Sequence, residues 1–326
     1  MKIREELERF YQSVLQPELK ILEAKRKKLL RQAVFIISGG LLVSLFLLLF
    51  SGFRQTFFLW LVPGMIVGIS FIFLQQNFSA FREEFKQKVI KPLVNLLGPS
   101  FQYFPDRGIP LSVFQDSRIF LQPVDLYQSE DLITGCWGQT NFSLSEVKAQ
   151  QKVTVRTRHG SFTYYQTFFQ GLFFLADFNK SFSGLTIVLP DTGERVFGHL
   201  AQTVQSWNIF RGQLIKMEDP EFEKEFVVYG SDQVEARYIL STSLMARILN
   251  FKRQTGRQIY LSFVHSTLRL AISREKGFLE PRFFSSLLDF TSIYQYYQDI
   301  CLCTEIVDAL NLNIRIWQTK ENAQKI

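Results

Sequence analysis

The sequence contains few residues of the kinds that mark a disulfide scaffold or a metal centre. Among 326 residues there are three cysteines, Cys136, Cys301 and Cys303, and three histidines. Disulfide-rich secreted domains are small and dense in cysteine, so this content favours a reducing compartment. The spacing Cys301-Leu-Cys303 is too short for an ordinary zinc site, which uses longer spacers and four ligands. We therefore expect no metal and no cofactor.

The familiar catalytic patterns are missing as well. The chain has no G-x-x-x-x-G-K-[ST] phosphate loop, no G-x-G-x-x-G, no H-E-x-x-H and no G-x-S-x-G. His159, His199 and His265 are scattered, and no nucleophile is paired with any of them. A surface role is the simpler interpretation of each histidine. The sequence therefore predicts no catalytic residue.

Most of the chain has no excess of positive charge. The net charge is +7, and residues 1–110 carry all of the excess, whereas residues 111–326 balance acids and bases. A nucleic-acid-binding domain would need a basic patch in the later part, where no run of Lys or Arg occurs. The sequence therefore predicts no nucleic-acid partner.

Two stretches near the N-terminus have no charge at all. Residues 33–53 and 56–74 are both apolar and follow each other closely. Because a bilayer core is crossed by about 20 apolar residues in a helix, each stretch is predicted as a transmembrane helix. Two adjoining spans with a short loop form a helical hairpin. The lipid bilayer is then an expected partner.

Basic residues flank the predicted hairpin on both sides, and the connecting loop carries only Arg54. Under the positive-inside rule this distribution predicts a multi-pass protein of the bacterial inner (plasma) membrane, with both termini and the later domain in the cytoplasm. Binding of acidic lipid is the alternative role for the same charges. The residues expected to anchor this topology are Lys25, Arg26, Lys27, Lys28, Arg31, Arg82, Lys86 and Lys88.

Helical periodicity continues on both sides of the predicted spans. Residues 1–32 are predicted as an amphipathic and basic helix, because apolar side chains recur every three or four positions in their first half. Residues 75–97 show the same spacing and are predicted as a helical stalk. The two apolar stripes can bury each other, or one of them can bind a partner protein or a second copy.

The rest of the chain predicts a mixed domain in two blocks, residues 98–210 and 211–326, with short strands and helices that do not alternate strictly. This pattern favours antiparallel β-hairpins over a doubly wound parallel sheet. The fold class predicted for the whole chain is α+β. It comprises an N-terminal two-span transmembrane helical hairpin with a helical stalk, followed by a cytoplasmic mixed domain.

Two hairpins and several helices can be placed within these blocks. Residues 142–156 and 161–175 flank the turn signal His159-Gly160 and predict one hairpin, and residues 259–264 and 268–272 predict a second. Further predicted elements are a helix over residues 196–207, a helix whose start is capped by Asp232 and Glu235, and a last helix over residues 287–310.

Polar side chains in two loops are the candidates for a binding site. The first group is the densest set of neighbouring carboxylates, which could share a proton or hold a cation. Its simpler interpretation is a solvated turn in which residues 129–131 cap a short helix. The second group follows a predicted buried strand, where loop side chains often line a site. The candidates are Asp125, Glu130, Asp131, Asp177, Asn179 and Lys180.

Several stretches resemble the bacterial membrane family known as domain of unknown function 3137. They are SRIF at 117–120, DLYQSEDLITG at 125–135, FSLSEV at 142–147, FQGLFFLADFNKSFSGLTIVLPD at 169–191 and DPEFEKEFVVYGSDQVEARYILS at 219–241. The resemblance extends over nearly the whole chain. It implies a membrane protein with a cytoplasmic domain, and it implies no activity and no catalytic residues.

The function expected from the sequence is a membrane-anchored cytoplasmic module for protein interaction or regulation, with no recognisable catalytic site. Its partner would be a membrane-associated protein, or a second copy bound through the stalk helices. The alternative is a membrane-bound hydrolase or lipid-acting enzyme with a carboxylate-based site. Whether the protein is an enzyme stays open at this point, with a non-enzymatic role favoured.

Overall fold

The structure is a computed structural model, and it describes residues 2–50, 57–158, 160–178, 180–191, 211–275 and 277–313. The chain divides into two compact units. The helical unit contains Met1–Leu93 and Leu279–Gln298, and the sheet unit contains Val94–Phe278 and Asp299–Ile326.

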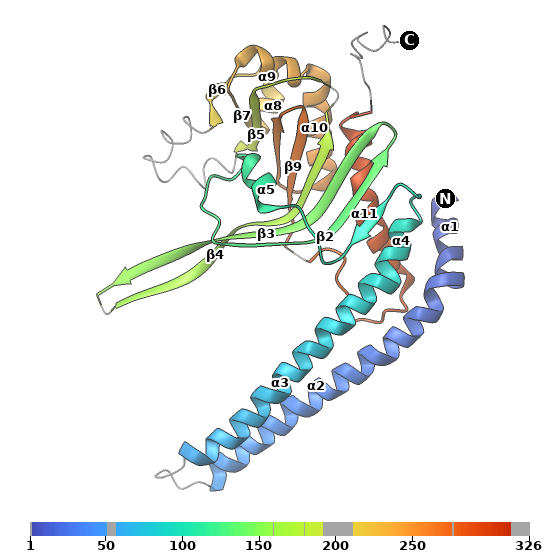
Figure 1. The fold of residues 1–326 in the computed structure, drawn as a ribbon, viewed down its shortest axis with the longest axis vertical. Coiled ribbons are helices and arrows are strands. Elements are labelled where there is room, and N and C mark those ends of the chain that lie inside the picture. The colour runs from blue at the N-terminus through green and yellow to red at the C-terminus, as the bar shows by residue number, and fades with distance from the viewer. Residues whose placement is uncertain are drawn as a thin grey trace, which may run out of the picture. The chain divides into compact units, whose positions relative to one another are not determined.

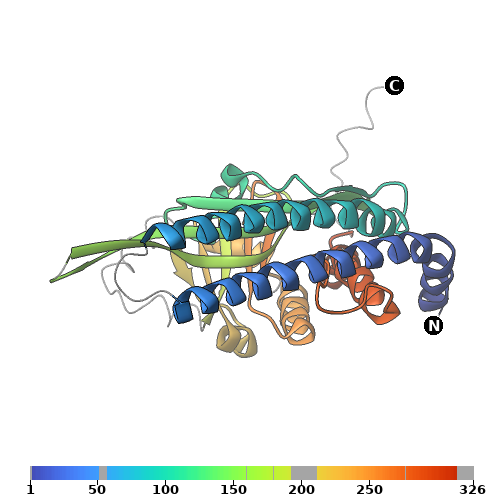
Figure 2. The same ribbon diagram turned by 90° about the horizontal axis from the view of Figure 1, so that it is seen from below.

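The helical unit is built on two long helices that lie side by side and run in opposite directions (Figures 1 and 2). In chain order its elements are α1 (Lys2–Phe10), the π-helical turn η1 (Tyr11–Leu15), α2 (Gln16–Phe50), α3 (Phe57–Phe85), the π-helical turn η2 (Lys86–Ile90) and α4 (Lys91–Asn95). Each π-turn lies just before a proline, Pro17 or Pro92. Since proline has no N–H to donate, the wider π-turn lets the helix continue past it.

Leucines and aromatic side chains form the core of this unit. The two predicted stripes are buried only in part, because Val14 and Leu96 are exposed by 46% and 38%. The buried residues are Leu7, Leu15, Leu19 and Leu22 on the first segment and Phe81, Phe85, Val89 and Leu93 on the second. The segment 279–298 adds Tyr296, whose ring centroid is 5.6 Å from that of Phe85.

The predicted transmembrane hairpin is overturned. No helix among the residues that the structure describes is both long enough and apolar enough to cross a membrane. The stretch 33–53 is not a helix of its own, because α2 begins at Gln16 and carries charged turns first, and 56–74 is only the first part of α3. Many side chains of both ranges, including those of residues 44–64, lie outside the described residues. The prediction of a multi-pass inner-membrane protein depended on these spans and falls with them.

The sheet unit contains one nine-stranded antiparallel sheet in the order β1-β2-β3-β4-β9-β8-β5-β7-β6. Its strands are β1 (Gln102–Phe104), β2 (Leu126–Trp137), β3 (Thr140–Thr157), β4 (Gly160–Asp177), β5 (Leu185–Pro190), β6 (Gln213–Ile215), β7 (Phe226–Gly230), β8 (Ile259–Val264) and β9 (Thr267–Ser273). The helices are α5 (Leu111–Asp116), α8 (Pro220–Glu225), α9 (Gln233–Ile239), α10 (Thr242–Thr255) and α11 (Phe290–Ala309), the last of which begins in the helical unit.

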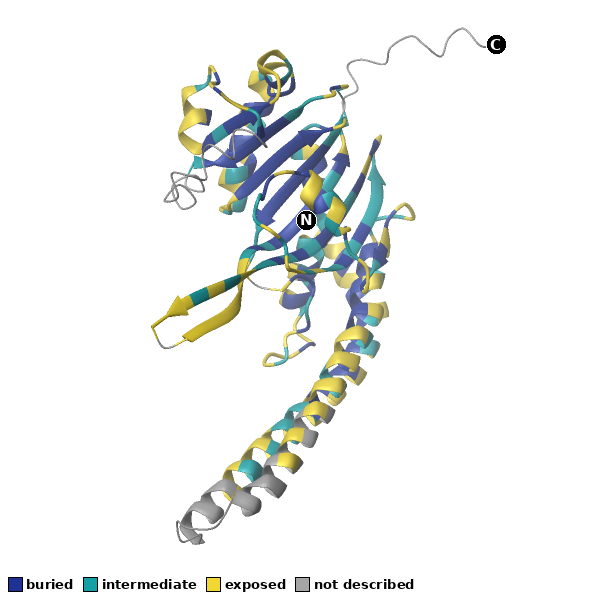
Figure 3. Cartoon of the chain, turned by 60° about the vertical axis from the view of Figure 1, so that its left-hand side comes forward, coloured by how far each residue is buried: buried dark blue, intermediate teal, exposed yellow. Residues whose placement is uncertain are grey.

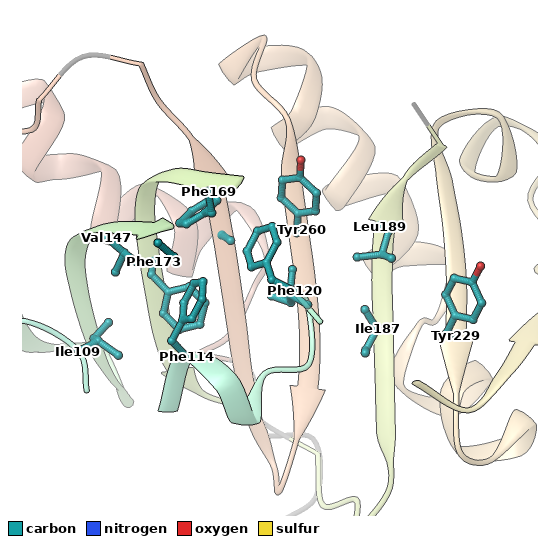
Figure 4. Packing of buried hydrophobic residues seen from close by; sticks show 13 residues of the cluster. Ile109, Phe114, Phe120, Val147, Phe169, Phe173, Ile187, Leu189, Tyr229 and Tyr260 are labelled. Carbon is teal, nitrogen blue, oxygen red and sulfur yellow. The ribbon is translucent and has the colours of Figure 1, made fainter. Parts of the chain in front are cut away.

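Both faces of the central strands are covered, with α5 on one side and α10 on the other (Figure 2). Every residue of β8 is buried, as expected for a strand between two layers. Under α5 the core is aromatic. Phe114 lies 5.2 Å from Phe173 and 5.5 Å from Phe120, centroid to centroid, and Figure 4 shows these rings against Tyr260 and Ile187.

Several sequence-based predictions are confirmed in this unit. The mixed α+β class with an antiparallel sheet is present, β3 pairs with β4, and β8 pairs with β9. The predicted cap at Asp232 is confirmed, because its carboxylate accepts a hydrogen bond of 2.8 Å from the amide of Glu235, whereas the Glu235 carboxylate accepts the amides of Ser183 and Gly184 and does not complete a capping box. The helix predicted over residues 196–207 lies outside the described residues.

The turn predicted around residues 129–131 is wrong. These residues belong to the strand β2, which pairs with β3 and has a bulge between Glu130 and Ile133. Asp131 takes the left-handed backbone conformation there, with φ of 59°. A bulge inserts one extra residue into a strand and bends it locally.

Candidate functional site

The four candidate carboxylates do not all converge on one site: oxygens of Glu130 and Asp131 lie within 4.8 Å of each other, whereas Asp125 and Asp177 lie far apart. The Asp125 carboxylate accepts the backbone N–H of Lys152 at 2.7 Å, and the Asp177 carboxylate accepts the side-chain amide of Asn141 at 2.8 Å. Both are thus fixed to β3, at two well-separated positions. At about 3.3 Å per strand residue, the separation of Asn141 and Lys152 along β3 is roughly 35 Å. Asp125 and Asp177 cannot act on the same substrate atom.

Asp131 is buried and hydrogen-bonded, which indicates a structural role. Its side chain is fully buried at the β2 bulge, where it accepts a hydrogen bond from the Tyr103 hydroxyl, and its backbone N–H donates to the Pro105 carbonyl at 3.1 Å. Glu130 precedes it and lies directly across from Glu146 on β3. The buried Asp131 therefore holds the irregular part of the strand against β1.

Lys180 caps the C-terminal end of helix α9. Its ammonium group donates to the carbonyls of Tyr238 and Ile239 at the last turn of α9 and lies 4.6 Å from the centroid of the Tyr238 ring. A cation at a helix C-terminus satisfies free carbonyls and the helix dipole. Partial burial lowers the pKa of Lys180. Its neighbour Asn179 lies outside the described residues.

Replacing Lys180 with methionine should therefore loosen α9 by about 1 kcal/mol, the usual contribution of a cation to a helix terminus. Hydrogen exchange of the α9 amides measures this change directly. Lys224→Met, at an exposed lysine, is the matched control and should leave α9 as it is. Unchanged exchange in the Lys180 variant would show that the contact does not hold the helix.

Two surface pockets flank α9. One, of about 480 Å³, is lined on its apolar side by Met217, Leu240 and Met245 and on its polar side by Arg237 and Glu218. The other is more open and is lined by short polar residues around Glu235. Both oxygens of Glu235 already accept backbone amides, those of Ser183 and Gly184, at 2.8 Å. Neither pocket gathers the carboxylates predicted from the sequence.

A buried arginine in the sheet was not predicted, because no local pattern marks it. Arg269 on β9 is 8% exposed, and its Nε and Nη1 atoms find no hydrogen-bond partner within the described part of the chain. Burial lowers the pKa of this guanidinium, and the charge of Asp116 opposes that effect. The Asp116 carboxylate thus supplies a countercharge at longer range for a cation held against the core.

Six of the eight predicted membrane anchors take part in ion pairs within the helical unit. Lys25 contacts Glu84 at 2.7 Å, and Lys88 contacts Glu18 at 2.8 Å. Lys88 also contacts Glu84 at 3.2 Å, and further pairs are Arg26–Glu23 at 2.7 Å, Lys27–Glu23 at 3.6 Å, Arg82–Glu280 at 2.6 Å and Lys86–Glu280 at 3.1 Å. Lys28 and Arg31 are exposed. The dense positive block therefore has acidic partners on the protein itself.

Beyond this charged region α2 carries apolar side chains that the described chain leaves uncovered. They lie on the second half of the helix, after Arg31. Val34, Phe35, Ile37, Leu41 and Leu42 are exposed by 61–79%. Val34, Ile37 and Leu41 are spaced by three and four residues and share one side of the helix, and Phe35 and Leu42, seven residues apart, form the adjacent row. Single exposed apolar residues are common on protein surfaces, whereas a group of five on one helix needs an explanation.

A two-stranded arm extends beyond the sheet (Figures 1 and 3). We define the arm as residues 151–157 of β3 and 160–167 of β4. It begins where the register shifts, because Ala149 pairs with Phe169 and Gln150 with Thr167, leaving Phe168 as an extra residue. A bulge of this kind bends the strands away from the sheet. The arm is exposed along most of its length.

Residues 167–312 match the model of a family described as Protein of unknown function (DUF3137). This match confirms the resemblance seen in the sequence for the part from the end of the arm through α11. The stretches noted at 117–147 lie before it. No match to this chain was found among curated proteins or among solved structures.

Proposed function

We propose that this protein is a non-enzymatic interaction module whose helical unit binds a partner protein through the apolar side of α2. The observation that carries the proposal is the uncovered group Val34, Phe35, Ile37, Leu41 and Leu42. Exposed apolar groups of this size mark interaction sites, because leaving them in water costs about 25 cal/mol for each Å².

The spacing of these side chains indicates a helical partner. Val34, Ile37 and Leu41 form a ridge of the kind that packs into the groove of another helix. At the base of the ridge, ion pairs such as Lys25–Glu84 fix α2 to α3. The surface offered to the partner is therefore rigid, which limits the entropy lost on binding.

An enzyme is the alternative, and the geometry gives it less support. Asp125 and Asp177 are bound to distant positions of β3, and the buried Asp131 accepts a hydrogen bond from the Tyr103 hydroxyl. Asp125→Asn and Asp177→Asn should leave a complementing phenotype intact in cells that lack the wild-type gene. Loss of the phenotype in either variant, with unchanged protein level, would favour the enzyme.

The interaction is tested by site-specific photo-cross-linking in cells. A benzophenone side chain placed at Phe35 should give one discrete cross-linked protein, and the same group at the exposed Lys28 should not. Adding Leu42→Gln should reduce the Phe35 product about tenfold, the effect of 1.4 kcal/mol. A product that is equal at both positions, or insensitive to Leu42, would contradict binding through this side of α2.

A further inference from the structure

The arm of the sheet unit has two chemically different faces. Directly paired residues of antiparallel strands share a face, and successive residues alternate. Val153 pairs with Tyr164 and Val155 with Phe162, which places these four side chains together. The ring centroids of Phe162 and Tyr164 are 6.1 Å apart. We call these four residues the apolar face of the arm.

The opposite face is basic. Lys152 pairs with Tyr165, and Arg156 pairs with Ser161. Thr154 and Thr163 lie between them, with their hydroxyls 3.0 Å apart. Neither Asp nor Glu occurs between Glu146 and Asp177, so the arm carries positive charge without compensation along its own strands.

The apolar face has no cover in the described structure. Phe162 is 55% exposed and Tyr164 is 43% exposed, whereas Phe169 and Phe173 farther along the same strand are buried. Among the described residues no further strand pairs with the outer edges of the arm, and on β3 the Lys152 N–H donates to the Asp125 carboxylate. Pairing of β2 with β3 stops at Gln150, and pairing of β9 with β4 starts only at Gly171. An exposed two-stranded ribbon is marginal by itself, so this face is stabilised by whatever covers it.

We propose that the apolar face of the arm binds the same face of a second copy of this chain. Face-to-face packing buries the apolar side chains of both copies and leaves Lys152 and Arg156 of each copy pointing outward. Edge-to-edge pairing through β3 would instead set Lys152 and Arg156 of the two copies beside one another, which is unfavourable, and pairing through either edge would leave the apolar face in water. An acidic partner would be attracted to the basic face and would leave Phe162 and Tyr164 in water.

The distribution of large and small side chains also fits a two-fold contact. Both aromatic residues of the apolar face lie on β4, and both valines lie on β3. A two-fold axis parallel to the strands places β4 of one copy over β3 of the other, so that Phe162 and Tyr164 pack on Val155 and Val153. The contact is small compared with a standard interface, and the dimer is accordingly weak and dependent on concentration.

This contact is separate from the α2 surface on which the proposed function rests, and either can fail alone. Cysteine cross-linking of the full chain in cells tests it. Two differently tagged copies, each carrying Val155→Cys, are expressed together and treated with a short bismaleimide. Thr154→Cys is the matched control, because Thr154 is the next residue, lies on the other face and is the more exposed of the two. The chain without either change reports cross-linking through the native cysteines.

The expected result is a cross-linked product that contains both tags in the Val155→Cys chain and is about tenfold weaker in Thr154→Cys. Adding Phe162→Ser should reduce the Val155→Cys product to a similar extent, since an aromatic anchor is lost from the contact. Leu42→Gln on α2 should leave it unchanged. Equal products from Val155→Cys and Thr154→Cys, no doubly tagged product, or a product that joins the chain to a different protein would each overturn the proposal.

Discussion

Replacing Phe173 with alanine should lower the free energy of unfolding of the sheet unit by about 3–5 kcal/mol, the usual cost of removing a buried aromatic ring. Phe173 is fully buried on β4, and its ring packs against that of Phe114 at 5.2 Å. Its cross-strand partner on β9 is Ala271, which is too small to fill the space that the ring leaves.

Hydrogen exchange of the β8 and β9 amides measures this loss within the sheet unit, without a contribution from the helical unit. Phe162→Ala is the matched control, because it removes the same ring from the same strand at a position that is 55% exposed. In dilute solution it should change stability by less than about 1 kcal/mol. An equal loss in both variants would contradict the division of β4 into a buried part and an exposed arm.

The two hairpins could be predicted from sequence because their signals are local. In β3 and β4 the alternation of side chains and the turn at His159-Gly160 lie within one continuous stretch. The bulge in β2 gave no such signal. The left-handed conformation of Asp131 is stabilised by the Tyr103 hydroxyl, which is 28 residues away in the chain. A contact between distant residues leaves no trace in the local pattern, and the polar residues 129–131 looked like a turn.

The charged block before Ala33 was misinterpreted for the same reason. A dense group of cations beside an apolar run looks the same in the sequence whether its partners are lipid head groups or carboxylates on another helix. Lys25 finds Glu84, which is 59 residues away. To interpret the charged block correctly one must know that α2 packs beside α3, and the sequence alone did not show this.

The two faces of the arm could be predicted from the sequence for β3 but not for β4. Alternation from Lys152 to Arg156 is plain, whereas Phe162, Tyr164 and Tyr165 include two adjacent aromatics. The register that separates Tyr165 from the other two is set by the turn and by the extra residue Phe168. Because a shift by one residue moves every side chain to the other face, the apolar face could be identified only from the strand pairing.

Replacing Glu23 with alanine should lower the stability of the helical unit by about 3–5 kcal/mol, because it leaves a buried cation without its partner. Glu23 and Arg26 are 4% and 7% exposed and are joined by two hydrogen bonds of 2.7 and 2.9 Å. Glu23 also accepts the backbone N–H of Leu287 at 3.1 Å. The matched control is Glu83→Ala, at an exposed carboxylate that contacts only the side chain of Gln87 among the hydrogen bonds described for it.

Urea unfolding at neutral pH measures the loss without screening the charges. The double variant Glu23→Leu/Arg26→Met should be more stable than Glu23→Ala alone, since two apolar side chains can replace a buried ion pair whereas a single unpaired charge cannot be accommodated. If the double variant were no more stable than Glu23→Ala, the loss would come from the missing contact to Leu287 and not from the buried charge of Arg26.

The same pair gives the helical unit a defined response to acid. The hydrogen bond from Arg26 is the main cause that lowers the pKa of Glu23 below its ordinary value of 4.5. A carboxylate with a lowered pKa in the folded state contributes stability that is fully present above the unfolded value and is lost as the pH falls through the folded value. The wild-type unit should therefore lose stability below a pH of about 4.5, whereas the Glu23→Gln variant should lack this part of the decline. Equal pH profiles for both proteins between neutral pH and pH about 3 would show that Glu23 is not held ionised by Arg26 in the folded state.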